Sequence, residues 1–122
     1  MRGLNKVIMI GRLGREPEIR ASRESGAKWG TFSLATNRSI RVGDSWEEAT
    51  DWHRVKCFGK LAERCALYLS KGSLVAVEGA VHSEQWTDDD GQRRYSTSIV
   101  ADSVTFLEPM QPKVEERSQI EA

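Results

Sequence analysis

The stretch that decides the fold is "DWHRVKCFGKLAERCALYLSKG", residues 51–72, because its apolar pattern changes period halfway along. If residues 51–58 form a β-strand, their side chains point alternately to two faces, and Val55 and Cys57 on one face can turn inward. In residues 60–72 the apolar side chains recur at i, i+4, i+7 and i+8 from Leu61, which is typical of an amphipathic helix. The stretch therefore predicts a strand followed directly by a helix, with Gly72 as the C′ residue that ends it.

Four further strands are expected around this unit, since each segment is rich in β-forming residues and is bounded by turn residues. They are residues 4–13, 27–37, 73–86 and 93–107, the third of these bent at Gly79. The "TDDDG" stretch, residues 87–91, is expected to be a hairpin turn. Residues 18–22 are expected to be an extended arm, and the polar residues 38–49 a mobile hairpin loop.

Five strands with one helix between the third and the fourth are the pattern of an all-β fold, the five-stranded Greek-key OB-fold barrel. Another small β-barrel remains an alternative. The barrel is expected to occupy residues 1–108 as one domain. Residues 109–122 have two prolines, few apolar residues and no periodicity, so we expect a short disordered tail.

The composition is that of a soluble globular chain, with 122 residues, 39% apolar and 30% charged. The formal net charge is zero, but residues 1–60 hold 12 Lys and Arg against 7 Asp and Glu, and residues 61–122 hold 6 against 11. What matters for binding is where these charges lie on the folded surface. No apolar run approaches the roughly 18–20 residues of a membrane span, and no signal peptide is present, so we expect a cytoplasmic, nucleoid-associated protein without a membrane partner.

The strand at residues 51–58 has two useful faces. One carries Asp51, His53, Val55 and Cys57, and the other carries Trp52, Arg54, Lys56 and Phe58. Aromatic rings stack on bases, at roughly 1–3 kcal/mol per base, and cations neutralise phosphates. OB-folds bind single strands on the face of their second and third strands. The second face therefore predicts a single-stranded nucleic-acid surface, and an interaction module that uses the same rings for a protein partner is the alternative.

Other candidate residues are less specific. Trp86 lies near the end of a hairpin strand, where its ring would extend the stacking surface. Arg2, Lys6, Lys60 and Lys71 would ring the same surface, although such residues are more often solvated side chains. Trp29 is a candidate for a subunit interface, and Trp46 lies in the expected loop.

The sequence does not support a metal-binding or catalytic site. His53, Cys57, Cys65 and His82 lack the spacing of zinc ligands, so no metal is expected, and the cysteines are read as buried thiols. The "DDDG" turn has Ile99 where a calcium loop needs Glu. The acidic residues fall mostly in turns, helix and tail, not clustered as a nuclease needs them. We therefore expect no cofactor and no enzyme activity.

Four segments resemble the bacterial single-stranded DNA-binding protein family in order and nearly unbroken spacing: "RGLNKVIMIGRLGREPEIR", "FSLATN", "TDWHRVKCFGKLAERCALYLSKGSLVAVEG" and "QWTDDDGQRRYST". The resemblance implies a homotetramer of OB-folds, with a dimer as the minimum, that wraps single-stranded DNA in replication, repair or recombination. It implies stacking by Trp52, Phe58 and Trp86, phosphate contacts from Arg54 and its basic neighbours, and a subunit-interface role for His53.

The chain also departs from the family pattern. Ile40 stands where a further stacking Trp is usual, and we treat Trp46 as a hypothetical substitute. The usually basic strand before Trp86 reads His82, Glu84 and Gln85, which predicts a shallower salt dependence. Leu74 and Ala76 replace larger residues where two dimers often meet. The chain ends in "VEERSQIEA" without the acidic tip that recruits proteins, so tail-mediated partners are not expected; a shortened chain or a phage, mobile-element or secondary version would explain this.

Overall fold

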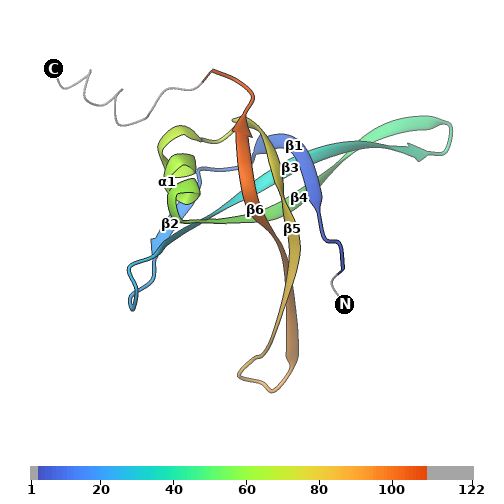
Figure 1. Cartoon of the computed structure of the whole chain (residues 1–122). Helices are drawn as coiled ribbons and strands as arrows, with labels where there is room; N and C mark the ends of the chain where they lie inside the picture. Colours follow the sequence, from blue (N-terminus) through green and yellow to red (C-terminus); the bar gives the residue numbers. More distant parts are fainter. Residues whose placement is uncertain (1–2, 110–122) are drawn as a thin grey trace.

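The computed structural model describes residues 3–109 and contains six strands and one helix (Figure 1). In chain order these are β1 (Val7–Leu13), β2 (Glu18–Ala21), β3 (Lys28–Val42), β4 (Ser45–Phe58), α1 (Gly59–Tyr68), β5 (Leu74–Thr87) and β6 (Arg93–Phe106). Within the described residues, no helix is long and apolar enough to cross a membrane. The expected tail lies outside this range except for Pro109.

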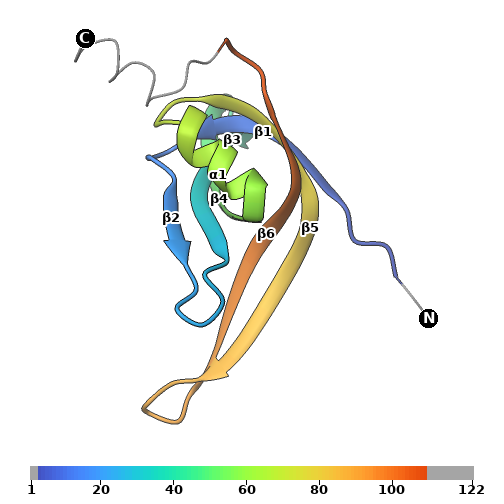
Figure 2. The same ribbon diagram turned by 60° about the vertical axis from the view of Figure 1, so that its left-hand side comes forward.

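Five of the strands close into a barrel in the order β1-β5-β6-β4-β3, and β1 closes it by pairing with β3 at Arg12↔Ala35 and Leu13↔Leu34. All pairings are antiparallel except β4 with β6, where Val55 lies opposite Ile99. The single helix α1 connects β4 to β5 at one end of this barrel (Figure 2). The OB-fold prediction is thereby confirmed. The segment expected as an extended arm is a sixth strand, β2, which pairs with the edge of β3.

The core fills the barrel with small and medium-sized apolar side chains. Leu34, Val55, Val75 and Val77 are fully buried, and α1 adds Ala62 and Cys65 at the end that it covers. The interior faces of β3, β4 and β5 show the expected alternation. The residues between the interior positions must consequently point outward.

The helix ends earlier than the predicted 60–72. Its last residue is Tyr68, and Leu69 is extended, with φ −94° and ψ 145°. Leaving the helix there places the Leu69 side chain, 0% exposed, in the core. Gly72 is therefore not the C′ residue; at φ 91° it forms a turn in which its N–H bonds to the Leu13 carbonyl at 2.8 Å.

The prediction of a mobile loop at residues 38–49 is wrong, because β3 and β4 run on past the barrel as a long hairpin arm (Figure 1). The strands turn at Gly43 and Asp44, and Gly43 has a positive φ of 63°, which glycine adopts without strain. Polar residues occupy both faces of the arm, so the sequence lacks the alternation that reveals a half-buried strand. Cross-strand bonds from Arg38 to Asp51 at 2.8 Å and from Thr50 to Asn37 at 2.9 Å support the ladder instead.

The β5–β6 hairpin agrees with its prediction. The strands shift register between Glu78 and Gly79, where the bend was expected, and they turn at residues 88–92. The Asp88 carboxylate closes this turn by accepting bonds from the Gln92 N–H at 2.9 Å and from the Arg94 guanidinium at 2.8 Å. These bonds lower the pKa of Asp88 from its ordinary value. The turn therefore holds the end of β5, and Trp86 with it, in a defined position.

Candidate nucleic-acid interface

The outer face of β4 carries the exposed rings that the alternation predicts. Trp52 is 61% exposed and Phe58 53% exposed, whereas Val55 and Cys57 between them are buried. Arg54 is exposed and lies between the two rings on the same face. Two aromatic side chains and a cation consequently share one open strand face.

The neighbouring strand β3 contributes a second row to this face. Ala35 pairs with Trp52, Ser33 with Arg54, Thr31 with Lys56 and Trp29 with Phe58, so these side chains lie beside each other. Because Ala35 and Ser33 have small side chains, Trp52 and Arg54 project beyond their neighbours on β3. Trp29 is half-buried, with the Arg20 guanidinium 5.9 Å from its ring, and it extends the aromatic surface at the Phe58 end. The sequence offered Trp29 only as a candidate for a subunit interface, and the pairing of β3 with β4 places it beside Phe58.

The ring of Trp52 rests against the connection between β1 and β2. A Cβ atom added to Gly14 would lie 2.4 Å from the Trp52 ring, which is far closer than atoms can approach. The Gly14 N–H bonds to the Ser33 carbonyl at 3.0 Å, so the backbone under the ring is held in place. A side chain at this position would therefore require the Trp52 ring to move.

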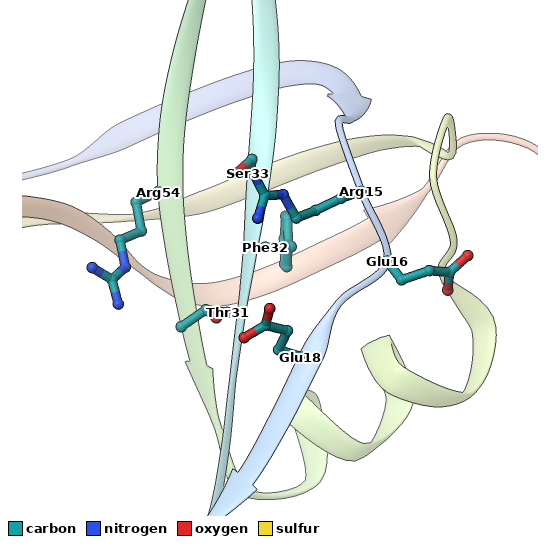
Figure 3. Close-up of a pocket in the computed structure, with 7 residues that line it drawn as sticks. All are labelled: Arg15, Glu16, Glu18, Thr31, Phe32, Ser33 and Arg54. Atoms are coloured by element: carbon teal, nitrogen blue, oxygen red, sulfur yellow. The ribbon is translucent and has the colours of Figure 1, made fainter.

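Beside Trp52 the same connection leaves a hollow over β3. One part, of about 260 Å³, is lined by Arg15, Glu16, Glu18, Thr31, Phe32, Ser33 and Arg54 (Figure 3). An adjoining part of about 370 Å³ is lined by Gly14, Arg15, Ser33 and Trp52. In Figure 3 the Arg15 guanidinium lies over Ser33, on the side facing Arg54, whereas Glu16 points away toward the turn after α1.

Arg15 is therefore a candidate site residue that the sequence analysis missed. Within residues 3–109, neither Arg15 nor Arg54 takes part in a salt bridge, so both guanidinium groups can meet an anion. The sequence signal was weak, because the segment around Arg15 was expected to be only a bend. The closure of the barrel brings it beside β4.

Lys56 differs from Arg54 because its ammonium is already paired. The Lys56 Nζ lies 3.3 Å from a Glu84 carboxylate oxygen on β5, and the Lys56 side chain is only 18% exposed. This pair joins the β4 face to the β5–β6 hairpin. Trp86 is 49% exposed and lies two residues beyond Glu84 on the same face of β5. A hollow of about 190 Å³ between Trp52, Arg54 and residues 97–99 of β6 continues the surface toward that hairpin.

The other predicted basic residues lie on other elements. Lys6 pairs with Glu78 of β5 at 4.0 Å, Lys60 lies in the first turn of α1, and Lys71 lies in the turn after it. Arg2 is outside the described residues. Their contacts with nucleic acid stay predictions.

His53 and the two cysteines belong to the inner side of the site. The His53 ring shares a 2.8 Å hydrogen bond with the Thr36 hydroxyl and is half-buried, and its subunit-interface role stays a prediction.

Cys57 and Cys65 are buried free thiols, as predicted. A hydrogen bond with Cys57 and burial raise the pKa of Cys65, so this thiol stays neutral. Among residues 3–109, no three His, Cys, Asp or Glu side chains are grouped as metal ligands.

Comparisons with known proteins agree with this geometry. The model of the single-strand binding protein family matches residues 4–107. Among solved structures, the chain is similar to a Plasmodium falciparum SSB in complex with ssDNA, with 34% sequence identity and a TM-score of 0.80. The match covers 88% of this chain and 98% of that one. The family match spans β1 to β6 and includes every strand of the surface described above, and we conclude that the chain belongs to the single-strand binding protein family.

Proposed function

We infer that this chain binds single-stranded DNA, without strong sequence preference, on the outer face of β3 and β4 and onward to the β5–β6 hairpin. The observation that carries this function is the pair of exposed rings, Trp52 and Phe58, with the cation Arg54 between them, which makes no salt bridge to any other described residue. A ring stacks on any base because every base has a π-face. Arg54 and Arg15 neutralise phosphates, and the counterions so released make the affinity dependent on salt.

The site selects single strands because its rings need unstacked bases. Trp52 and Phe58 are six residues apart on one strand, about 20 Å at the rise of a β-strand. A duplex keeps its base faces inside its own stack and offers only edges and phosphates.

The chain is a binding protein and not an enzyme, in keeping with its family. We place it in the cytoplasm, where it protects single strands during DNA replication, recombination and repair.

The protein is proposed to act as a homo-oligomer, a dimer at least and a tetramer in its full form. The outer face of β1 supports self-association, because Ile8 is 64% exposed and Ile10 61% exposed beside Ala76 of β5. Val7 to Ile10 pair with β5 along one edge, and within the described residues the other edge of this segment has no strand partner. An open apolar strand edge is a ready template for pairing with another chain.

The proposed function is tested by titrating the protein with oligo-dT and following its tryptophan fluorescence. We expect strong quenching at low salt, weaker binding as salt rises, and poor competition by duplex DNA of equal length. Trp52→Ala should weaken binding by about 1–3 kcal/mol, since one base loses its stacking partner. Absence of quenching by oligo-dT at low salt would refute DNA binding and favour the protein-interaction alternative.

Gly14→Ala is expected to weaken oligo-dT binding by on the order of 1 kcal/mol, a fraction of a stacking contact, because the new methyl group displaces the Trp52 ring. The backbone at Gly14 is not left-handed, so an alanine is sterically opposed only by that ring. Gly3→Ala is the matched control, since a Cβ at Gly3 meets nothing within 4 Å. Equal affinities of the two variants would show that Gly14 does not position Trp52.

Glu84→Gln is expected to strengthen binding to oligo-dT at low salt, because it releases the Lys56 ammonium to meet a phosphate. The slope of log affinity against log salt should steepen by about 0.7 for one added phosphate contact. Glu63→Gln, on the exposed side of α1 where it pairs with Lys28, changes the net charge equally and serves as control. If both variants bind alike, Lys56 is not restrained by Glu84.

Ile8→Glu is expected to lower the mass measured by light scattering, because a carboxylate cannot be buried at an apolar contact between copies without a partner. The fold should persist, since Ile8 is largely exposed. Leu107→Glu, a similar change at another exposed apolar residue, should leave the mass unchanged. A wild-type protein that is monomeric with and without DNA would refute the oligomer.

A further inference from the structure

A carboxylate lies on the part of the surface where DNA binding alone calls for rings and cations. Glu18 lines the hollow of about 260 Å³ over β3, together with Arg15 and Arg54. In Figure 3 the Glu18 carboxylate extends from β2 toward Thr31, while the Arg15 guanidinium lies over Ser33. The hollow therefore has a negative group at one end and a positive group at the other.

Strand pairing fixes the face on which this carboxylate lies. Glu18 is opposite Thr31 of β3, and Thr31 is in turn opposite Lys56 of β4. Directly paired residues project to the same face of a sheet, and Ser33, two residues beyond Thr31, shares that face. Glu18 is consequently on the same outer face as the rings of β4.

The two charged groups of the hollow do not neutralise each other. Within residues 3–109, no salt bridge joins Glu18 to Arg15. The carboxylate of Glu18 pairs with Arg20 at 3.5 Å, but both side chains are more than half exposed, so water screens this pair. The hollow thus presents an acceptor group and a donor group that one ligand can engage together.

The carboxylate of Glu18 selects the part of a DNA strand that can lie against it. It accepts hydrogen bonds at both oxygens and donates none, and it repels a phosphate. Along a DNA strand, the phosphates and deoxyribose rings carry no N–H donor, and the donors belong to the base edges. A strand that crosses the hollow therefore has a reason to turn a base edge toward Glu18.

Guanine is the base whose edge matches both charged groups. Its Watson–Crick edge presents two neighbouring donors, N1–H and the N2 amino group, beside the O6 acceptor. Two parallel donors fit the two oxygens of Glu18, and the Arg15 guanidinium is a donor for O6. Adenine and cytosine present one amino group beside a ring nitrogen that repels the second carboxylate oxygen. Thymine presents a single N–H between two carbonyl oxygens.

The hollow has room for a base beside Trp52. Its adjoining part, of about 370 Å³, is lined by Trp52 and shares Arg15 with the first part. Pockets for small ligands have volumes of roughly 300–1,000 Å³, so the two parts together accommodate one nucleobase. Arg54 lines the part that holds Glu18, where its guanidinium can meet the phosphate of the same nucleotide.

We propose that the hollow lined by Arg15, Glu18, Thr31, Ser33 and Arg54 is a guanine-selective subsite. Glu18 accepts from N1–H and the N2 amino group, Arg15 donates to O6, and Arg54 meets the phosphate. The inference rests on the proposed function, and it makes one position of an otherwise sequence-tolerant surface selective. Because water competes at the half-exposed carboxylate, the preference for guanine lies at the low end for a bidentate contact, about 5-fold.

The test compares strands of oligo-dT, about 8 nucleotides long and within the range of OB-fold site sizes, that differ at one central base. We expect the strand with guanine to bind about 5-fold more tightly than the all-thymine strand, as measured by competition for the protein. Strands with adenine or cytosine at that place should bind as thymine does. Inosine keeps O6 and N1–H but lacks the N2 amino group, so it should lose most of the preference.

Glu18→Gln is expected to abolish the preference for guanine, because an amide offers one acceptor and one donor to two guanine donors. The substitution also releases Arg20, which acts on every strand alike, so the readout is the ratio of guanine to thymine affinities. Glu24→Gln, at an exposed position in the turn after β2, makes the same change of charge. This matched control should keep the wild-type ratio.

The outcomes separate the subsite from the function on which it rests. Equal binding of the guanine and thymine strands by the wild type would overturn the subsite and leave the proposed function standing. A preference that survives in Glu18→Gln, or that inosine reproduces in full, would also overturn it, since two donors would then not be meeting this carboxylate. Absence of binding to every strand would refute the proposed function and the subsite with it.

Discussion

The site depends on the burial of Val55 and Cys57 inside the barrel. These two side chains are held there by pairing with β3 on one side and with β6 on the other, where Val55 lies opposite Ile99. Because a strand alternates strictly, burying them forces Trp52, Arg54 and Phe58 to the outside. A slip of one residue in the register would bury the cations, so the energy that stabilises the core also orients the rings.

Two kinds of support surround this strand. The barrel positions Trp52 by placing Gly14 beneath its ring, and the β5–β6 hairpin joins the face through the Lys56–Glu84 pair. The salt bridge with Glu84 engages the Lys56 ammonium, a cation to which the family resemblance assigns a phosphate contact. Among residues 3–109, the rings and the two arginines that make no salt bridge there, Arg15 and Arg54, are left as the main proposed contacts, which agrees with a surface that relies more on stacking than on charge.

The sequence correctly predicted those elements in which the spacing of apolar residues follows their burial. The alternation of residues 51–58, the amphipathic start of α1 and the bend at Gly79 all correspond to the structure. It was wrong for residues 38–49, because a strand that is solvated on both faces shows no apolar alternation. It also extended the helix past Tyr68, since periodicity does not reveal that Leu69 reaches the core only from an extended backbone.

The sequence by itself determined the class of fold, the strand whose outer face carries rings and cations, and the family, because each depends on local order along the chain. The tertiary structure decided which of those groups are available. Only barrel closure brings Arg15 beside Arg54, places Gly14 under Trp52, and sets Lys56 against Glu84. These contacts join residues distant along the chain, and no local pattern records them.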